Sequence, residues 1–351
     1  MSKERPKVAL LVAPTTSAAV LYGMFDVLYS VGAVYPDMVL GAPGSEQLDV
    51  QIVSADGAPF RCPGNVLVEP HAGLETAGRR PEIVIVCDMY SPIYSVPRGD
   101  YAVYRDWLRD MHRQGALIGS VCSGALVLAE AGLLDGCEVA LHWAYADLFA
   151  REYPRSRLRR DSVLCLTHEA AGIITAGGVT SWQELVLHVI RRLCGPDAAR
   201  QTAKVHLLAG HEHGQLPYAM MNRHQTVTDA VITACQEYIA MNYRDPNPVQ
   251  RMVERSGLNV RTFARRFRAA TGRSAIDYVV ALRIEEAKQM LEASDADVEE
   301  ISWSVGYEDP AAFRRVFRRE AGASPTEHRR RFTRFGMTQA RRQGADGPAR
   351  G

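Results

Sequence analysis

Two stretches near the C-terminus repeat each other fifty residues apart, one at residues 263–274 and the other at residues 313–324. Each stretch places two phenylalanines four residues apart and contains a glycine near its end, Gly272 or Gly322. The phenylalanine spacing indicates the apolar face of a helix, and the arginines between them form a second face. The sequence therefore predicts two similar helical units with basic surfaces, a pattern typical of proteins that bind nucleic acid at two places.

Each repeat also has the pattern of a helix-turn-helix. In the first copy, a helix at Val249–Arg255 precedes the turn Ser256-Gly257-Leu258, and Asn259 is expected to cap the second helix. The corresponding parts of the second copy are Val298–Ser304, Gly306 and Asp309. A motif of this kind inserts its second helix into the major groove of DNA, where an arginine can bond guanine through two nitrogens.

The basic residues are clustered on the repeated helices. Arg261, Arg265 and Arg268 share one face of the first helix, and Arg315 and Arg318 hold the equivalent places in the second. The net charge of the whole chain is only +1, yet residues 261–273 contain five arginines and no acid. This distribution indicates a local basic patch rather than a generally basic protein.

From about Val249 to Phe332 the chain resembles the AraC/XylS family of transcription regulators. The motifs that carry the resemblance are Ser256-Gly257-Leu258, Arg261–Phe267, Thr271-Gly272, Arg283–Ala287, Gly306-Tyr307, Phe313–Phe317 and Gly322–Pro325. The resemblance implies that both units contact double-stranded DNA. We expect the DNA-binding residues to be Arg261, Thr262, Ala264, Arg265, Arg268, Pro310, Ala311, Arg314, Arg315 and Arg318.

The two copies are not expected to act alike. Pro310 and Ala311 lie at the leading edge of the second repeated helix, and their side chains cannot hydrogen-bond a base edge. Contacts to phosphate position a protein on DNA, whereas contacts to bases give sequence specificity. We therefore expect the first copy to specify the sequence and the second copy to anchor the protein.

Residues 6–195 alternate short apolar runs with amphipathic stretches. The runs are Val8–Ala13, Val50–Ser54, Ile83–Cys87, Leu117–Val121 and Gly172–Ala176. This alternation predicts an α/β domain with a largely parallel sheet. It is followed by an expected linker at 196–227, an all-α domain at 228–335 with the two helix-turn-helix units, and a disordered polar tail at 336–351.

Within the first domain, the segment Ala116–Leu126 predicts a buried strand that turns sharply into a helix at Cys122, as in a nucleophile elbow. A thiol at a helix N-terminus is expected to have a lowered pKa, which favours the thiolate. Cys122 has three interpretations: a nucleophile, a redox-sensitive thiol, or the floor of a ligand pocket. The third is favoured. Tyr90 and Tyr94 follow the strand at Ile83–Cys87, where an open α/β sheet places its ligand crevice.

From about Val8 to Cys194 the chain resembles the class I glutamine amidotransferase-like (PfpI-like) superfamily. The resemblance rests on the elbow at Cys122, on His142 and on residues 175–185. It implies Cys122 and His142 as catalytic candidates, and Asp26 as an acid near the pocket. The chain departs from the family pattern at Ser120, at Cys87-Asp88-Met89 and at Val20. These departures favour a degenerate domain used for sensing, with Cys122, His142, Asp26, Tyr90 and Tyr94 as the ligand-binding residues.

These patterns together predict a sequence-specific DNA-binding transcription regulator in the cytoplasm. The resemblance implies a homodimer and a small effector such as an amino acid or a quaternary amine. No cofactor, metal or membrane is expected, and His211-Glu-His213 is interpreted as a polar hinge. The alternative is a thiol hydrolase or hydratase, or a redox sensor, that acts through Cys122.

Overall fold

The chain forms two compact units in the computed structural model, one ending at Gln215 and one beginning at Leu216. The structure describes residues 4–78, 80–93, 99, 101–166, 169–208, 210, 214–220 and 229–332. The tail expected at 336–351 lies outside these residues. So do parts of the expected linker, at 209, 211–213 and 221–227.

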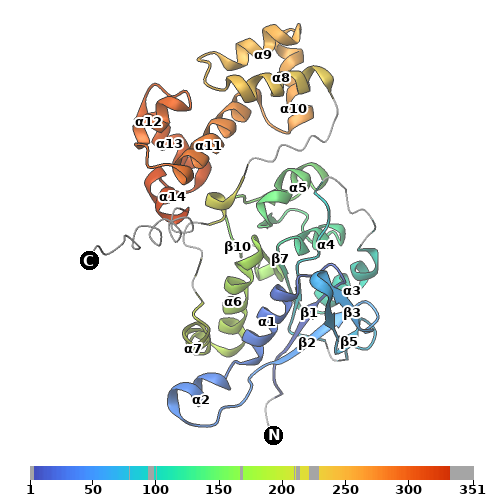
Figure 1. Ribbon diagram of the computed structural model, residues 1–351. Coiled ribbons are helices and arrows are strands. Elements are labelled where there is room, and N and C mark those ends of the chain that lie inside the picture. The colour runs from blue at the N-terminus through green and yellow to red at the C-terminus, as the bar shows by residue number, and fades with distance from the viewer. Residues whose placement is uncertain are drawn as a thin grey trace, which may run out of the picture. The chain divides into compact units, whose positions relative to one another are not determined.

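A seven-stranded sheet forms the centre of the first unit, in the order β10-β11-β7-β6-β1-β2-β5 (Figure 1). The strands are β1 (Lys7–Leu11), β2 (Asp49–Ser54), β5 (Ala72–Gly73), β6 (Ile83–Val86), β7 (Leu117–Val121), β10 (Leu164–Cys165) and β11 (Ile173–Ala176). All neighbours pair in parallel except β10 and β11. Two short pairs stand apart: β3 (Phe60–Cys62) with β4 (Val66–Val68), and β8 (Glu138–Val139) with β9 (Arg157–Leu158). The largely parallel sheet is confirmed.

Helices cover both faces of this sheet, so its strands are apolar on both sides. On one face, α1 (Ala18–Tyr29) and α6 (Trp182–Cys194) pack over a core that includes Leu10. On the other face, α3 (Ala102–Arg113), α4 (Gly124–Glu130) and α5 (Ala146–Glu152) pack over a core that includes Leu11. Adjacent residues of β1 therefore serve opposite cores, which explains the continuous apolar runs of the sequence.

Two further helices lie at the margin of the first unit. α2 (Val34–Leu40) has no buried residue. α7 (Pro196–His206) packs against α6, although a linker was expected from residue 196. Residues up to Gln215 belong with the first unit, because α7 supplies buried Ala198 to the core beneath α1 and α6. Among the described residues, no single helix is long and apolar enough to cross a membrane, and α1 with α2 meets that test only as a pair bent by 66°.

The described part of the second unit is helical. Its helices are α8 (Ala230–Asn242), α9 (Pro248–Ser256), α10 (Val260–Thr271), α11 (Ala275–Ala293), α12 (Val298–Ser304), α13 (Pro310–Ala321) and α14 (Pro325–Phe332). They form two bundles on one long helix, α11 (Figure 1). The first half of α11 shares a core with α8–α10, and the second half shares a core with α12 and α13.

Arg283, in the middle of α11, connects the two bundles. Its guanidinium donates to the carbonyls of Tyr243 and Asp245, at 2.7 Å and 2.8 Å, just after α8. The same group lies over the ring of Tyr307 in the second bundle, 5.5 Å from its centroid. An arginine that satisfies carbonyls and stacks on an aromatic ring holds both partners in a fixed geometry. The spacing between the bundles is therefore set by side-chain packing as well as by the helix.

The separate cores of the two bundles lead to a prediction for Phe317→Ala. Phe317 is fully buried in the second bundle, so its truncation should cost about 3–5 kcal/mol of stability. Amide hydrogen exchange should become faster in α12 and α13 than in α9 and α10. Phe267→Ala, in the first bundle, is the matched control and should give the reverse pattern. Equal acceleration in both bundles would show that they unfold as one.

Candidate DNA interface and sheet-edge site

The first helix-turn-helix consists of α9, a turn and α10. Gly257 ends α9 with a φ of 63°, a left-handed conformation that favours glycine. Asn259 accepts a hydrogen bond from the Thr262 amide at 2.9 Å, so the predicted N-cap is confirmed. Phe263 and Phe267 are buried. Their burial turns the opposite face of α10 outward.

The second helix-turn-helix consists of α12, a turn and α13. Gly306 has a φ of 88°, a left-handed conformation that favours glycine. A Cβ at this position would also meet the backbone of Arg244 at 3.0 Å, so both the conformation and the close approach favour glycine. Asp309 caps α13 by accepting from the amides of Ala311 and Ala312. Pro310 occupies the first turn of α13, where its missing N–H costs no hydrogen bond.

The arginines predicted to meet DNA differ between the two units. Arg261, Arg265 and Arg268 are exposed on α10, and within the described part of the chain their side chains have no ion-pair or hydrogen-bond partner. The three arginines of α13 that are predicted to meet DNA all lie near acids. The pairs are Arg314 with Glu299 at 3.2 Å, Arg315 with Asp309 at 4.0 Å, and Arg318 with Glu327 at 3.9 Å. The basic face of the second unit is thus partly neutralised by its own residues.

Arg266 belongs to the same basic run but has a structural role. Its guanidinium makes two hydrogen bonds to Asp229, at 2.8 Å and 2.7 Å. Asp229 also caps α8, so this pair fixes α10 against the start of α8. The hydrogen bonds from Arg266 lower the pKa of the Asp229 carboxyl. The sequence repeat alone does not separate this arginine from those that face outward.

The strand-to-helix turn at Cys122 has the predicted geometry. Cys122 has a φ of 56°, which is strained for a residue with a side chain, and its amide donates to Ala176 at 2.9 Å. Gly124 lies so close to the end of β6 that a Cβ would meet the carbonyl oxygens of Val86 and Cys87 at 2.6 Å. The turn therefore requires glycine at this position. Ser120 is fully buried beneath it.

Asp88 is a residue of this site that was not predicted from the sequence. It follows β6 at the carboxyl edge of the sheet and is only 8% exposed. Its carboxylate accepts from the Ser17 amide at 3.3 Å, at the N-terminus of α1. Burial raises its pKa from the usual 3.8 to about 6, and its charge acts on the thiols of Cys62, Cys87 and Cys122. Its place directly after a buried strand was the available sequence signal.

The expected thiolate at Cys122 is wrong. Burial raises the pKa of the Cys122 thiol to about 12, and the negative charge of Asp88 acts in the same direction. The hydrogen bonds from Ser123 lower the pKa but are outweighed. The dipole of α4 is weak support for a negative charge, because the helix has only seven residues. Desolvation therefore dominates, and Cys122 is a neutral thiol at physiological pH.

His142 lies at the start of a short 3-10 turn, Trp143–Tyr145. Its Nδ1 accepts from the Ala144 amide at 3.2 Å, and burial lowers its pKa, so the ring is neutral at pH 7. His142 and Cys122 make no hydrogen bond with each other, although the structure describes both. Tyr145 lies within electrostatic reach of Cys122 and of Tyr90, which is 62% exposed. Tyr145 also lies edge-on to His142, with 6.4 Å between the ring centroids, so it stands near both predicted site residues.

Asp26, another predicted ligand-binding residue, does not join this group. Asp26 is exposed on α1 and acts electrostatically on His206 at the end of α7. It lies nine residues along the helix from Ser17, about 13 Å at the rise of an α-helix, so it is separated from Asp88. Tyr94, His211 and His213 lie outside the described residues.

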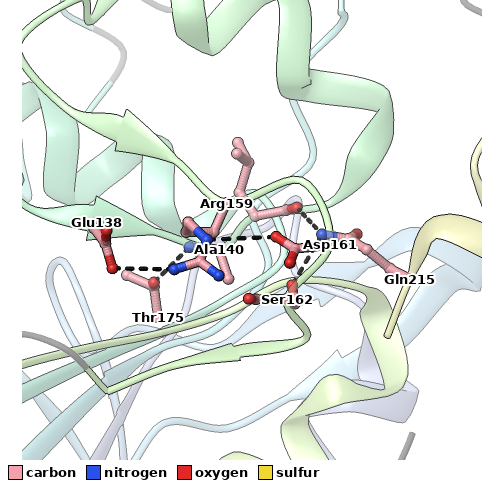
Figure 2. A network of polar contacts seen from close by, with 8 residues as sticks. Glu138, Ala140, Arg159, Asp161, Ser162, Thr175 and Gln215 are labelled. Atoms are coloured by element: carbon pink, nitrogen blue, oxygen red, sulfur yellow. Dashed lines mark hydrogen bonds and ion pairs between the residues drawn. The ribbon is translucent and has the colours of Figure 1, made fainter. Parts of the chain in front are cut away.

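Gln215, the last residue of the first unit, was also not predicted as a site residue. It is 3% exposed, and its side chain bonds the backbone on both sides of His142: the amide nitrogen donates to Leu141, and the oxygen accepts from Trp143. Figure 2 shows it beside Ser162, whose carbonyl it also contacts, and the ion-paired Arg159 and Asp161. A residue predicted to lie in a linker is therefore part of the His142 site.

Comparisons with known proteins match both units. The model of the DJ-1/PfpI family matches residues 7–192, which is more than half of the chain. The chain belongs to the DJ-1/PfpI family. A helix-turn-helix domain model matches residues 252–331, and this second domain is of the AraC type. Both resemblances found in the sequence are therefore confirmed.

Individual relatives share one or both of these regions. The HTH-type transcriptional regulator CdhR of Pseudomonas aeruginosa is 28% identical over 313 residues, which cover 87% of this chain and 88% of the relative. The HTH-type transcriptional regulator GlxA of Rhizobium meliloti is 28% identical over 264 residues, or 74% of this chain and 78% of the relative. Isonitrile hydratase of Pseudomonas putida is 27% identical over 204 residues, or 55% of this chain and 75% of the relative.

The buried carboxyl of the DJ-1/PfpI domain leads to a prediction for Asp88→Asn. Because the folded-state pKa of Asp88 is raised from 3.8 to about 6, the native protein binds its proton more tightly than the unfolded chain, and stability falls as pH rises through this window. The substitution should therefore stabilise the protein by up to about 3 kcal/mol at pH 7, with the difference disappearing near pH 4. Denaturant unfolding at several pH values measures this.

The control for that experiment is Asp26→Asn, which removes an exposed carboxylate from α1. It separates the effect of burial from the general effect of removing one negative charge. A gain at pH 7 that persists undiminished at pH 4 would contradict the assignment to the ionisation of Asp88.

The neutral thiol of the DJ-1/PfpI domain predicts slow alkylation of Cys122. A pKa of about 12 leaves almost no thiolate at pH 8. Iodoacetamide should then modify Cys122 at least about a hundred-fold more slowly than a small free thiol. Mass spectrometry of the native protein measures this, with the protein unfolded in guanidinium as the control. Rapid modification of native Cys122 would instead support its interpretation as a nucleophile or a redox-sensitive thiol.

Proposed function

We infer that this chain is a sequence-specific DNA-binding transcription regulator, and we propose that a small molecule bound in its DJ-1/PfpI domain controls it. The observation that carries this function is the pair of helix-turn-helix units on α11, with three arginines on the exposed face of α10 that have no partner among the described residues. Guanidinium groups in this position can bond base edges and phosphates in the major groove. The regulators CdhR and GlxA, which align over most of this chain, support the same function.

We propose that the effector binds at the carboxyl edge of the sheet, near Cys122 and His142. Asp88 favours a positively charged ligand at this edge. It is a buried carboxyl that has no cationic partner among the described residues. A buried charge is stabilised by an opposite charge. An effector with a positively charged nitrogen, such as an amino acid or a quaternary amine, would supply it. Tyr90 and Tyr145, which lie within electrostatic reach of each other, would supply aromatic rings to such a cation.

We propose that this domain senses its ligand rather than transforming it. A thiol hydrolase, a hydratase or a redox sensor acting through Cys122 needs a thiolate, and burial together with Asp88 disfavours that form. His142, the base that the resemblance implies, is not hydrogen-bonded to the thiol among the described residues, which also favours sensing. The likeness to isonitrile hydratase keeps the alternative relevant, because related chains include an enzyme.

The proposal also concerns assembly and location. We propose that the protein acts as a homodimer, since the resemblance to AraC/XylS regulators with a PfpI-like domain implies one. A regulator that binds promoter DNA acts where the chromosome lies, which in a bacterial cell is the cytoplasm.

The unequal arginine faces predict unequal effects of Arg265→Ala and Arg315→Ala. The duplex for this test is selected by the wild-type protein from a randomised library. Arg265→Ala should weaken specific binding by about 1–3 kcal/mol and relax the preferred sequence, because we propose that its exposed guanidinium bonds bases. Arg315→Ala should weaken binding less and equally for all sequences, because Asp309 already neutralises part of its charge. Fluorescence anisotropy measures both.

The same titrations are repeated at several salt concentrations, with circular dichroism as the control for folding. Binding through arginine–phosphate contacts must weaken as salt rises. Salt-insensitive binding, or a change in base preference caused only by Arg315→Ala, would contradict the proposed division between the units.

A further inference from the structure

The chain leaves the first unit through a residue that is built into the His142 site. The side-chain nitrogen of Gln215 donates to the carbonyls of Leu141 at 3.0 Å and Ser162 at 3.1 Å, and its oxygen accepts from the Trp143 amide at 3.1 Å. These bonds use both amide hydrogens and the amide oxygen. Both polar atoms of the side chain are therefore hydrogen-bonded to the backbone of the loops that hold His142.

The surroundings of Gln215 leave little room for it to move. Gly214 has a φ of 64°, and a Cβ there would meet the carbonyl of Asp161 at 2.1 Å. A Cβ on Gly177 would meet the Gln215 amide nitrogen at 2.9 Å. Asp161 is held in turn by Arg159, which also pairs with Glu138 on β8 (Figure 2). Gly214 and Gly177 thus permit the close packing of the Gln215 side chain against the loops around Asp161 and His142.

Only a few residues later the chain is fixed to the second unit. Lys288 of α11 donates to the carbonyl of Ala219 at 2.6 Å, and Lys288 is itself only 7% exposed. The ring of Tyr218 lies edge-on to Phe332 of α14, 5.6 Å between centroids, with Arg331 over its face. The short 3-10 turn Leu216–Tyr218 also packs against α13. These contacts attach the turn to α11, α13 and α14 of the second unit.

The connection between these two anchors is short. Four peptide units separate Gln215 from Ala219, so their Cα atoms can be at most about 14 Å apart. A 3-10 turn within this stretch shortens it further, because it rises only about 2.0 Å per residue. A displacement of the Leu141–Trp143 backbone must then either release Gln215 or be passed on to Lys288.

We propose that residues 214–219 form a strap that couples the His142 loop to the second helix-turn-helix, with Gln215 as its positioning residue. Ligand binding beside His142 changes the backbone positions of Leu141 and Trp143, and Gln215 carries the change to the helices α11, α13 and α14. The inference rests on the proposed function and adds to it the route of control. Coupling is reciprocal, so DNA bound to the second unit alters the His142 loop in return.

This reciprocity permits a test in which the probe is DNA, since the effector is unidentified. The full-length protein is mixed with the selected duplex, and the exchange rate of the Trp143 amide is measured by hydrogen-exchange mass spectrometry with and without DNA. DNA should change this rate by about five-fold or more in the wild type. Gln215→Ala should abolish the DNA-dependent change, whereas Gln114→Ala, on an exposed glutamine after α3, should retain it.

Gln215→Ala removes the hydrogen-bond acceptor of the Trp143 amide, so it could raise the exchange rate of this amide both with and without DNA. A second variant controls for this structural effect. Lys288→Met cuts the strap at its other end and leaves the His142 loop intact, so it should also abolish the DNA-dependent change. DNA binding by the wild type without any change at Trp143, or a change that survives both substitutions, would overturn the strap. Absence of DNA binding by the wild type would instead overturn the proposed function on which it rests.

Discussion

Desolvation at the carboxyl edge of the parallel sheet determines what the first domain can do chemically. Cys122 is held in a left-handed turn at the N-terminus of α4, a position that in isolation favours a thiolate. Burial and the charge of Asp88 act against ionisation and raise the pKa of the thiol to about 12. The geometry of a nucleophile elbow is therefore retained while ionisation of its thiol is disfavoured. The same burial raises the pKa of Asp88 and leaves a carboxyl that a cationic ligand would stabilise.

The arginines of the second domain differ in the groups that they contact. Some hold the structure together, and others are exposed on the helices predicted to meet DNA. Arg266 and Arg283 bond Asp229 and backbone carbonyls, and so hold the bundles together. Arg261, Arg265 and Arg268 on α10 remain unpartnered among the described residues, whereas Arg314, Arg315 and Arg318 on α13 lie near acids. An exposed ion pair is worth little to stability, but it must be exchanged before the arginine contacts phosphate. Two units of nearly the same pattern can therefore bind DNA with different strength.

The features predicted well from the sequence depend on neighbouring residues. Apolar runs located the main strands, and side-chain caps located the starts of α10 and α13, because each of these signals is contained within a few residues. Asp88 and Gln215 were missed because their contacts, to Ser17 and to Leu141, span more than seventy residues. Asp26 was misplaced for a related reason: family position identified its helix, but its distance along α1 carries it away from the sheet edge. Desolvation at Cys122 likewise requires knowledge of the packing.

The order in which the chain meets the two bundles bears on how control would operate. After Gln215 the chain attaches first to α11, α13 and α14, although the next helix in sequence is α8. The half that receives this attachment is the one with Pro310 and Ala311 at its leading edge and with its arginines already near acids. If the second unit anchors the protein as proposed, a change transmitted to that half would alter how firmly the protein is held on phosphate. It would leave base contacts by the arginines of α10 as they were. Effector control by this route would then change affinity and not sequence preference, because the proposal assigns the two properties to different bundles of one domain.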